Sequence, residues 1–371
     1  MNYKEEDMRS FGRLIGELVN GIDMERELCK EAYRQVILNE QPELQQGAFL
    51  SAHLAKKATL DELCGVWDAL YEYDTATISP DFPEDCCDIV GTGSDALKTI
   101  NVSTPASFLA AACGVKVAKK GARLVTGVSG ATDILEIMGL SIASPLSQAE
   151  KCLEEHGICY LPGEAFLQAG WGRLIQSMRF TSTFNIIGPL TKPCAKTTSI
   201  VIGAYAPEIC PQLIEVLRGT GTKAAMSPYG MSSEHDPTLG IDEVSVCGPT
   251  QIVELRQDQV ETYTLMPADF GIQQHSYTAI ASKKDARANV AAILAVLSGQ
   301  YDTPVADLFC VNAACALRVS GVEENLKKAT EMARETIANG TALDKLRRLI
   351  RFQGDENGEE KLESLLNLSV K

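Results

Sequence analysis

Two neighbouring segments decide how this chain folds. The first reads Asp88-Ile89-Val90-Gly91-Thr92-Gly93-Ser94-Asp95, and the second reads Thr99-Ile100-Asn101-Val102-Ser103-Thr104-Pro105. In the first, a short apolar strand ends and runs into a glycine-rich turn, where residues without a Cβ let backbone N–H groups approach an anion. In the second, Ser103 is a predicted helix cap and Pro105 a first-turn residue, so a helix start adds free N–H groups and a partial positive charge.

Polar side chains near these segments complete a predicted phosphate site. The hydroxyls of Thr99, Ser103 and Thr104 add hydrogen-bond donors and a candidate metal ligand, and Lys119 adds a full positive charge after the strand 115–118. Each piece alone is most often a turn, a helix cap or a solvated lysine, but their order along a short stretch of chain favours phosphate binding. The stretch lacks the third glycine and the acidic residue of a dinucleotide fingerprint, and no Gly-Lys-Ser/Thr of a Walker loop follows.

The composition excludes several classes of protein. With 371 residues, 45% of them hydrophobic and 22% charged, the chain has the profile of a globular protein with room for one large domain or two of ordinary size. The net charge of −15 argues against nucleic acid as the main partner, because phosphate backbones require a cationic surface.

Cysteine usage and hydropathy indicate a cytoplasmic protein. The twelve cysteines are scattered without a Cys-x-x-Cys spacing, and the chain begins with the charged run Lys4-Glu5-Glu6-Asp7 rather than a signal peptide. No apolar run is long enough to cross a bilayer. We therefore expect reduced, mostly buried thiols and no membrane contact.

The chain is organised as a helical region followed by an α/β region. Apolar residues recur at helical spacing over residues 1–75, and Thr59 with Glu62 has the spacing of a capping box. After a proline-containing linker at residues 79–83, short apolar strands alternate with helices, which predicts a mostly parallel or mixed sheet. Further helices are expected over 286–297, 305–319 and 322–337, and a last short helix follows a break at 354–358.

Beyond the two opening segments, several motifs follow at characteristic spacing. They are Ala111–Lys119, Ser129-Gly130-x-x-Asp133-x-Leu135-Glu136, Phe184–Thr191, Asp242-Glu243 and Asn312-Ala313-Ala314. With Gly91–Asp95 and Asn101–Thr104, they make the sequence resemble the anthranilate phosphoribosyltransferase family, which shares its fold with the pyrimidine nucleoside phosphorylases. The resemblance covers nearly the whole chain and leaves only the last fifteen to twenty or so residues unmatched.

The resemblance implies an architecture of two domains. A small helical domain would comprise residues 1–75 with returning helices at about 165–188. A larger α/β domain with a central mixed sheet would comprise residues 84–164 and 189–353, and residues 354–371 would form a C-terminal extension. Members of this family are usually homodimers joined through the helical domain.

The resemblance also implies a substrate, phosphoribosyl diphosphate chelated by Mg²⁺, and a small aromatic acceptor. By position, Ser103, Asp242 and Glu243 would bind the metal ions, whose preferred ligands are oxygen atoms. Catalysis would come from positioning and from stabilising the departing diphosphate, without a nucleophile–base pair. The implied substrate-binding residues are Gly91, Thr92, Gly93, Ser94, Asp95, Thr99, Asn101, Ser103, Thr104, Lys119, Gly121, Ala122, Arg123 and Gln176.

The acceptor-binding positions depart from the family pattern. The family's Lys-His-Gly-Asn is Lys119-Lys120-Gly121-Ala122 here, its His-Pro aligns with Leu167-Gln168, and its Arg-Arg pair aligns with Ile175-Gln176. The loop at about 228–240, which contains His235, is also longer. Losing the carboxylate-pairing arginine removes a charge-assisted hydrogen bond worth roughly 1.5–3 kcal/mol, unless Arg173 or Arg179 replaces it. A different acceptor, such as a neutral aromatic or nitrogen heterocycle, is therefore an open alternative to anthranilate.

Two other functions remain open from the sequence. A nucleoside phosphorylase is favoured by Gly121-x-Arg123-Leu124 and the 129–136 stretch, whereas Asp242-Glu243 points away from it. A family member acting as a non-catalytic binding module is the second alternative. A metal requirement for turnover would separate the first from a phosphoribosyltransferase, and binding of phosphoribosyl diphosphate would separate the second.

Overall fold

The computed structural model describes two compact units. It covers residues 3–93, 95–123, 128–168, 170–178, 182–232, 239–300 and 303–369, without the side chains of 175–177 and 369. One unit is helical and comprises Met1–Thr77, Phe166–Pro193 and Glu215–Thr220, and the other comprises Ile78–Ala165, Cys194–Ile214 and Gly221–Lys371. The residues 354–371, expected as a separate extension, belong to the second unit, and the helical unit includes a segment at 215–220 that the sequence did not indicate.

The helical unit is held together by aromatic residues on facing helices. Phe11 and Phe49 lie 5.1 Å apart between ring centroids, and Tyr33 meets Phe184 edge to face at 5.2 Å. Such pairs bury large apolar areas, so the returning segment is fixed to the N-terminal helices. The elements are α1 (Glu5–Val19), α2 (Arg26–Ile37), α3 (Glu43–Lys56), α4 (Leu60–Asp74), α9 (Gly170–Met178), α10 (Phe184–Ile187) and the 3₁₀ turn η1 (Gly188–Leu190).

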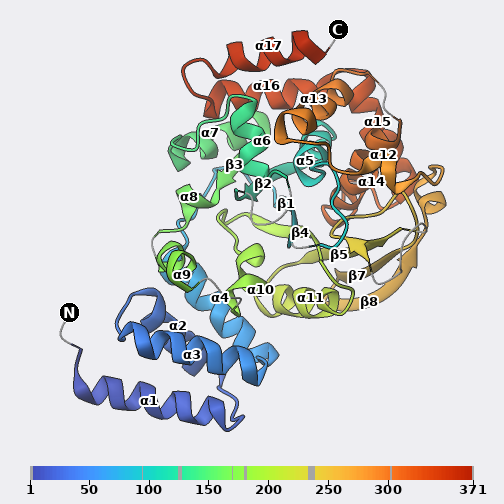
Figure 1. Ribbon diagram of the computed structural model, residues 1–371. Coiled ribbons are helices and arrows are strands. Elements are labelled where there is room, and N and C mark those ends of the chain that lie inside the picture. The colour runs from blue at the N-terminus through green and yellow to red at the C-terminus, as the bar shows by residue number, and fades with distance from the viewer. Residues whose placement is uncertain are drawn as a thin grey trace. The chain divides into compact units, whose positions relative to one another are not determined.

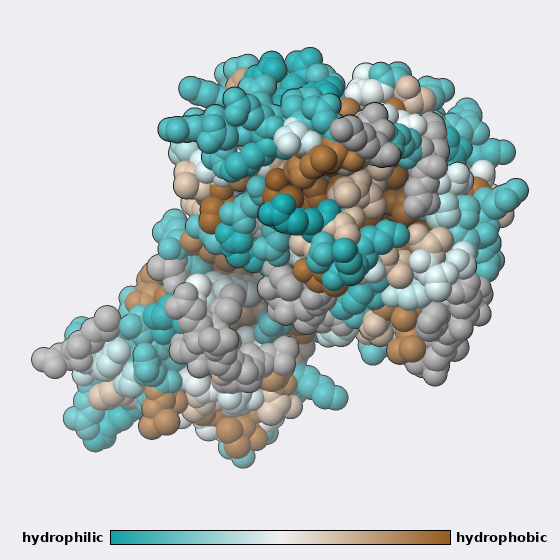
Figure 2. All heavy atoms as spheres, turned by 45° about the horizontal axis from the view of Figure 1, so that its top comes forward, coloured by the Kyte–Doolittle hydropathy of each residue, from teal (hydrophilic) through white to brown (hydrophobic). Residues whose placement is uncertain are grey.

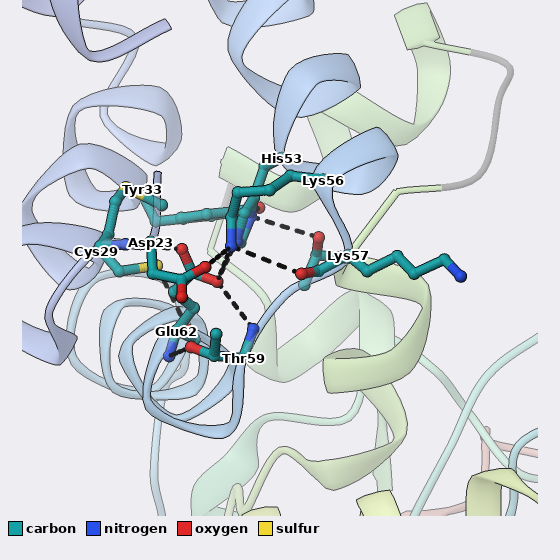
Figure 3. A network of polar contacts seen from close by, with 10 residues as sticks. Asp23, Cys29, Tyr33, His53, Lys56, Lys57, Thr59 and Glu62 are labelled. Atoms are coloured by element: carbon teal, nitrogen blue, oxygen red, sulfur yellow. Dashed lines mark hydrogen bonds and ion pairs between the residues drawn. The ribbon is translucent and has the colours of Figure 1, made fainter. Parts of the chain in front are cut away.

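A buried carboxylate connects the helices of this unit (Figure 3). Glu62, at the start of α4, is fully buried and accepts hydrogen bonds from the backbone N–H groups of Met24 (2.8 Å) and Thr59 (2.7 Å). The Thr59 hydroxyl accepts from the Glu62 N–H, which confirms the predicted capping box. Lys56 lies 2.8 Å from the same carboxylate with its side chain 3% exposed, and Asp23 is its second partner. The N-cap of the following helix α2 is Glu25, two residues after Asp23.

His53 extends this network toward the returning segment. Its Nδ1 lies 2.7 Å from the Tyr33 hydroxyl and 3.4 Å from that of Thr183, and its Nε2 lies 3.5 Å from Glu62 Oε2. Burial lowers the pKa of His53, so the ring is neutral near pH 7. A neutral ring that accepts at Nδ1 and carries its proton on Nε2 suits both neighbours.

The second unit is built on an eight-stranded sheet (Figure 1). The strand order is β3-β2-β1-β4-β5-β7-β8, with β6 paired to β5. Strands β3 to β5 along this path are parallel, and β6, β7 and β8 are antiparallel, which confirms the predicted mixed sheet. The strands are β1 (Cys86–Gly91), β2 (Lys116–Gly121), β3 (Ile158–Pro162), β4 (Thr197–Gly203), β5 (Ala224–Met231), β6 (Gly240–Ile241), β7 (Thr250–Arg256) and β8 (Gln259–Leu265).

Apolar helices pack against the parallel strands of this sheet. Helix α14 contacts β1, β4 and β5, and α5 contacts β1 and β2. Every described position of α14 from Val305 to Leu317 is buried, as expected for a central helix of the unit. The helices are α5 (Ser103–Ala112), α6 (Ala131–Ile137), α7 (Leu146–His156), α8 (Gly163–Phe166), α11 (Ile209–Gly219), the 3₁₀ turn η2 (Pro267–Phe270), α12 (Tyr277–Ile280), α13 (Ala286–Leu297), α14 (Thr303–Val319), α15 (Leu326–Ala338), α16 (Thr341–Gln353) and α17 (Gly358–Ser369).

The C-terminal helices close the edge of the sheet at β3. The side chain of Gln353, at the end of α16, accepts from Tyr160 N at 2.9 Å and donates to Tyr160 O at 2.7 Å, as a neighbouring strand would. Helix α17 then packs on α13 and α16. In Figure 2, which brings the top of Figure 1 forward, the upper surface is mostly hydrophilic. No helix in the described part of the chain is long and apolar enough to span a membrane.

The buried carboxylate of Glu62 generates a stability prediction. Replacing Glu62 by Gln leaves the ammonium group of Lys56 with one exposed partner, and breaking a buried ion pair is costly. We expect the free energy of unfolding of the helical unit to fall by roughly 2–4 kcal/mol, measured by chemical denaturation followed by circular dichroism.

Glu72→Gln, on the same helix, is the matched control. Glu72 pairs with Lys30 at 2.7 Å but its side chain is 51% exposed, so its loss should change stability far less. Equal effects of the two substitutions would contradict a special role for the buried network.

Candidate functional site

The glycine-rich turn lies at one edge of the parallel sheet. Strands β1, β2 and β4 are parallel neighbours and end at Gly91, Gly121 and Gly203. The carboxyl ends of parallel strands meet at a common edge, which is where open α/β sheets place their ligands. The turn after β1, the start of α5 and the residues after β6 therefore surround the same space.

Three carboxylates meet at this edge of the sheet. One oxygen from each of Asp95, Asp242 and Glu243 lies within 4.8 Å of the others, an arrangement that can hold a metal ion. Asp95 is 9% exposed and Asp242 is 7% exposed. Three acidic groups so close together repel one another unless protons or cations neutralise them.

Glycines make the room that Asp242 needs. A Cβ on Gly91 would lie 2.3 Å from Asp242 Oδ2, and one on Gly203 would lie 1.3 Å from Asp242 O. The N–H of Gly93, whose φ is +68°, donates to Asp242 Oδ2 at 2.7 Å. The glycines thus make room for Asp242 and donate a hydrogen bond to its carboxylate, in addition to the anion-binding role expected from the sequence.

The segment after the two acids is fixed from α14. The Asn312 side chain accepts from Val244 N at 2.9 Å and donates to Val244 O at 3.1 Å. Asn312 is 2% exposed, so these hydrogen bonds are shielded from water. The Asn312-Ala313-Ala314 motif therefore positions Glu243 through its neighbour in the chain.

The environment of the acids raises their pKa values. Burial, and then the charge of Asp95, raises the pKa of Asp242 to about 7. Burial, followed by the charges of Asp242 and Asp95, raises the pKa of Glu243 well above its ordinary value. Burial also raises the pKa of Asp95, although the ammonium group of Lys98, 2.5 Å from Asp95 Oδ1, opposes the shift. Without a cation the cluster holds protons at a pH where isolated carboxyl groups are ionised.

The start of α5 faces the predicted phosphate position with a different cap from the one expected. The N-cap is Val102, and Ser103 is the first helical residue without a side-chain capping bond, so the predicted capping role of Ser103 is wrong. Its hydroxyl instead lies 3.3 Å from Lys119 Nζ. The Thr104 hydroxyl is buried without a hydrogen-bond partner among the described residues. A buried unpaired hydroxyl beside a helix start is the kind of group that a bound oxyanion would satisfy.

Lys119 is buried rather than solvated. It is 3% exposed, and its ammonium group donates to Ile89 O at 2.7 Å. Burial lowers its pKa to about 8. The next residue, Lys120, forms an ion pair with Asp88 at 2.5 Å, and both side chains are almost fully buried. Lys120, which replaces the family's histidine, is therefore engaged in a buried ion pair with Asp88.

The other predicted substrate-binding residues divide into two groups. Thr92 lies in the turn, where its hydroxyl accepts from Tyr205 N at 3.0 Å, and the Thr99 hydroxyl lies 3.4 Å from Glu243 Oε2. Asn101, by contrast, directs its carboxamide to Ser129, donating to its carbonyl at 2.9 Å and accepting from its hydroxyl at 2.7 Å.

The segment after β2 presents its side chains differently. Gly121 lies against Tyr160, whose hydroxyl would be 2.4 Å from a Cβ at this position. Ala122 is exposed. The guanidinium of Arg123 is bound by three acids, Asp133 at 3.4 Å, Glu136 at 2.6 Å and Glu164 at 3.2 Å.

Several predicted acceptor positions lie in the helical unit or outside the described residues. Leu167 forms an isolated bridge with Thr75. Arg173 donates to Val36 O at 2.6 Å and Gln46 Oε1 at 3.0 Å, which engages it within that unit. Outside the described residues or side chains lie Ser94, Leu124, Ile175, Gln176, Arg179 and, in the longer loop, residues 233–238 with His235.

Sequence reasoning missed part of this site. Asp95 was expected to bind substrate, and its position makes it a third candidate metal ligand. Gly203, which ends an apolar strand, and Asn312 were not expected to support the acids. The signal for Gly203 was a glycine directly after a buried strand, whereas nothing local to Asn312 indicated its partner.

The ligand atoms that this site offers suit a hard divalent cation. They are carboxylate oxygens, with the hydroxyl of Thr99 within hydrogen-bonding reach of Glu243. Mg²⁺ prefers oxygen ligands, retains several waters and bridges phosphates. Burial and mutual repulsion raise the pKa values of Asp242 and Glu243, so a bound cation would relieve the repulsion among the acids.

Comparisons with known proteins show which family this chain resembles. The family model of a glycosyl transferase α/β domain matches residues 83–343, and that of its helical bundle domain matches residues 13–73. Anthranilate phosphoribosyltransferase of Aeromonas hydrophila is 33% identical, over 92% of this chain and 97% of that protein. That of Methanothermobacter thermautotrophicus is 31% identical, over 92% and 98%.

Solved structures share the fold. Anthranilate phosphoribosyltransferase of Thermus thermophilus has a TM-score of 0.81 at 26% identity, covering 91% of this chain and 98% of that one. The Saccharomyces cerevisiae enzyme, in complex with phosphoribosyl diphosphate and Mg, has a TM-score of 0.80 at 24% identity, covering 97% and 99%. With its sequence motifs, its two units and these relatives, the chain belongs to the anthranilate phosphoribosyltransferase family of glycosyl transferases.

Proposed function

We propose that the protein transfers the 5-phosphoribosyl group from phosphoribosyl diphosphate to a small aromatic amine, with anthranilate as the first acceptor to test. The observation that carries this proposal is the cluster of Asp95, Asp242 and Glu243 beside a glycine-rich turn and a helix start. A site with acids on one side and amide donors on the other suits a metal-chelated diphosphate.

The residues of the α/β unit would divide the binding of the donor between them. The turn Gly91–Asp95 and the start of α5 would direct N–H groups to phosphate oxygens. The unpaired hydroxyl of Thr104 would donate a hydrogen bond to a phosphate oxygen, and Lys119 would supply a positive charge close to Ser103. Burial of Lys119 strengthens its attraction for an anion, because the surrounding dielectric is low.

Asp242 and Glu243, with Asp95 and Ser103, would hold Mg²⁺. The metal would neutralise the charge that develops on the departing diphosphate. The carbon–oxygen bond to diphosphate breaks while the amine nitrogen forms a new bond to the same ribosyl carbon, and the amine proton leaves to solvent. The chain's contribution is positioning and charge stabilisation, which matches a site without a nucleophile–base pair.

Relatives named anthranilate phosphoribosyltransferase over nearly their full length support anthranilate as the acceptor. The substitutions at Ala122, Leu167, Ile175 and Gln176 leave its carboxylate without the partners that the family supplies, and Arg173 is engaged elsewhere. Which aromatic amine the protein accepts is therefore the question that the experiment must answer. The comparisons support neither a different acceptor, nor a nucleoside phosphorylase, nor a non-catalytic binding module.

The decisive experiment follows diphosphate release from phosphoribosyl diphosphate with Mg²⁺ and a panel of aromatic amines and azoles that includes anthranilate. We expect release that requires both the metal and one acceptor of the panel. Asp242→Asn and Glu243→Gln should each lower turnover by at least about a hundredfold, because transition-state charge loses its metal.

Asp258→Asn, an exposed acid in the turn between β7 and β8, is the matched control and should retain full activity. If the two site variants turned over at the rate of this control, the assignment of the metal ligands would be wrong. Failure of the wild-type protein to bind phosphoribosyl diphosphate in calorimetry would remove the proposed function itself.

Magnesium should stabilise the protein in a pH-dependent manner. The pKa of Asp242 is raised to about 7, so protons compete with the metal at lower pH and metal binding releases them. The rise in melting temperature on adding Mg²⁺ should be larger at about pH 8 than at about pH 6, where the carboxyl groups hold protons. In Asp242→Asn the metal should have little effect at either pH. An equal metal effect at both pH values would count against the shared site.

We further propose a cytoplasmic homodimer that associates through the helical unit. All twelve cysteines are free, in keeping with a reducing compartment. The helical unit exposes large apolar side chains, among them Val19 (71% exposed), Ile22 (53%) and Leu44 (86%). Exposed apolar groups of this kind are typical of interaction surfaces.

Light scattering should give twice the chain mass of 40.1 kDa. Val19→Glu combined with Leu44→Glu should shift the protein toward the monomer, since charges disfavour a buried apolar contact. Leu368→Glu, on the 68% exposed Leu368 of α17, is the control and should leave the mass unchanged. A wild-type protein that is monomeric at all concentrations would rule out the dimer.

A further inference from the structure

We infer that Asn289, on α13, is a positioning residue that sets the direction of the hydrogen bonds around the donor-binding segment 98–101. This inference rests on the proposed function, because the segment carries Thr99 and Asn101. Asn289 is 1% exposed, and its side chain is hydrogen-bonded to Lys283, Ser129 and Ser282. Its role is therefore indirect, and it follows from which of its atoms donate and which accept.

The orientation of the Asn289 carboxamide is determined by a backbone group. Lys283 N lies 2.9 Å from Asn289 Oδ1, and a backbone N–H can only donate. The Oδ1 atom must therefore face Lys283, and Nδ2 must face the two hydroxyls on the other side, those of Ser129 and Ser282, each at 3.2 Å. Both hydrogens of Nδ2 are engaged, so the two serine oxygens accept from Asn289.

Asn101 is oriented independently from the other end. Its Nδ2 lies 2.9 Å from the carbonyl oxygen of Ser129, which can only accept. Its Oδ1 therefore faces the Ser129 hydroxyl at 2.7 Å and needs a donor there. Because the Ser129 oxygen already accepts from Asn289, its single proton is available for Asn101. The two amides together leave the Ser129 hydroxyl one orientation.

The same asparagine also reaches the other end of the segment. Ser282, whose hydroxyl accepts from Asn289, donates its backbone N–H to Lys98 O at 2.9 Å. Ile100 N donates to Ile280 O at 3.0 Å in the adjoining turn. Residues 98–101 are therefore held at both ends in a closed circuit of hydrogen bonds that meets at Asn289. Thr99, whose hydroxyl lies 3.4 Å from Glu243, sits inside this circuit.

Asn289→Asp tests the direction of these bonds while nearly preserving shape. The aspartate would still accept from Lys283 N, but it would present an acceptor to Ser129, which cannot donate to both Asp and Asn101. We expect the dissociation constant for phosphoribosyl diphosphate with Mg²⁺, measured by calorimetry, to rise about tenfold, equivalent to about 1.4 kcal/mol. Ser129→Ala, which removes only the shared hydroxyl, should weaken binding in the same direction.

The double variant Asn289→Asp with Ser129→Ala separates a specific path from general damage. If Asn289 acts through Ser129, the aspartate should weaken donor binding far less in the Ser129→Ala background than in the wild type. Val290→Ala is the matched control for stability, because Val290 is the next residue of α13 and fully buried. It should lower the melting temperature without changing the dissociation constant of the donor.

Hydrogen exchange supplies a readout that is independent of activity. In the protein without ligand, peptides covering residues 98–101 and 128–131 should exchange faster in Asn289→Asp than in Val290→Ala. Failure of the wild type to bind the donor would remove the proposed function, and the exchange comparison would still test the circuit. Unchanged exchange in both segments, or additive losses of donor binding in the double variant, would overturn the role of Asn289.

Discussion

The repulsion among Asp95, Asp242 and Glu243 is the constraint on which the rest of the site depends. Three acidic groups within 4.8 Å are stable only when protons or cations neutralise them. Gly91 and Gly203 leave space for Asp242, and the backbone N–H of Gly93 donates to its carboxylate. The fold thus maintains an unfavourable charge arrangement, which a divalent cation converts into a favourable one.

The predicted acceptor positions are divided between the two units, whereas the predicted donor positions lie in one. The groups expected to hold the donor all lie in the α/β unit, as does the acceptor position Ala122, whereas Leu167, Ile175 and Gln176 lie in the helical unit. The carboxylate cluster itself is built from residues of the α/β unit alone.

Local patterns predicted the parts of the structure that local forces determine. The capping box of Thr59 and Glu62, the strand before Gly91 and the helix over 286–297 follow from residue spacing, and the structure has each of them. The predicted helix start at Val322 was wrong, because Asn325 caps α15 and the helix begins at Leu326.

Contacts between segments far apart in the sequence could not be predicted from local patterns. Ser103 is not the expected cap because the helix already begins at Ser103, whose hydroxyl accepts from Lys119 of a neighbouring strand. Asn312 with Val244 and Asn289 with Ser129 are separated by 68 and 160 residues, so no periodicity could indicate them. Polar residues in helix interiors were the only trace that these contacts left in the sequence.

The pairing of Gln353 with Tyr160 has a consequence for how the protein is made. The edge strand β3 is synthesised early, but the side chain that satisfies its backbone comes 193 residues later. During translation this strand carries unpaired backbone groups until almost the entire chain has left the ribosome, and such edges favour aggregation. The edge of the nascent sheet at Tyr160 therefore gains this protection only late in synthesis.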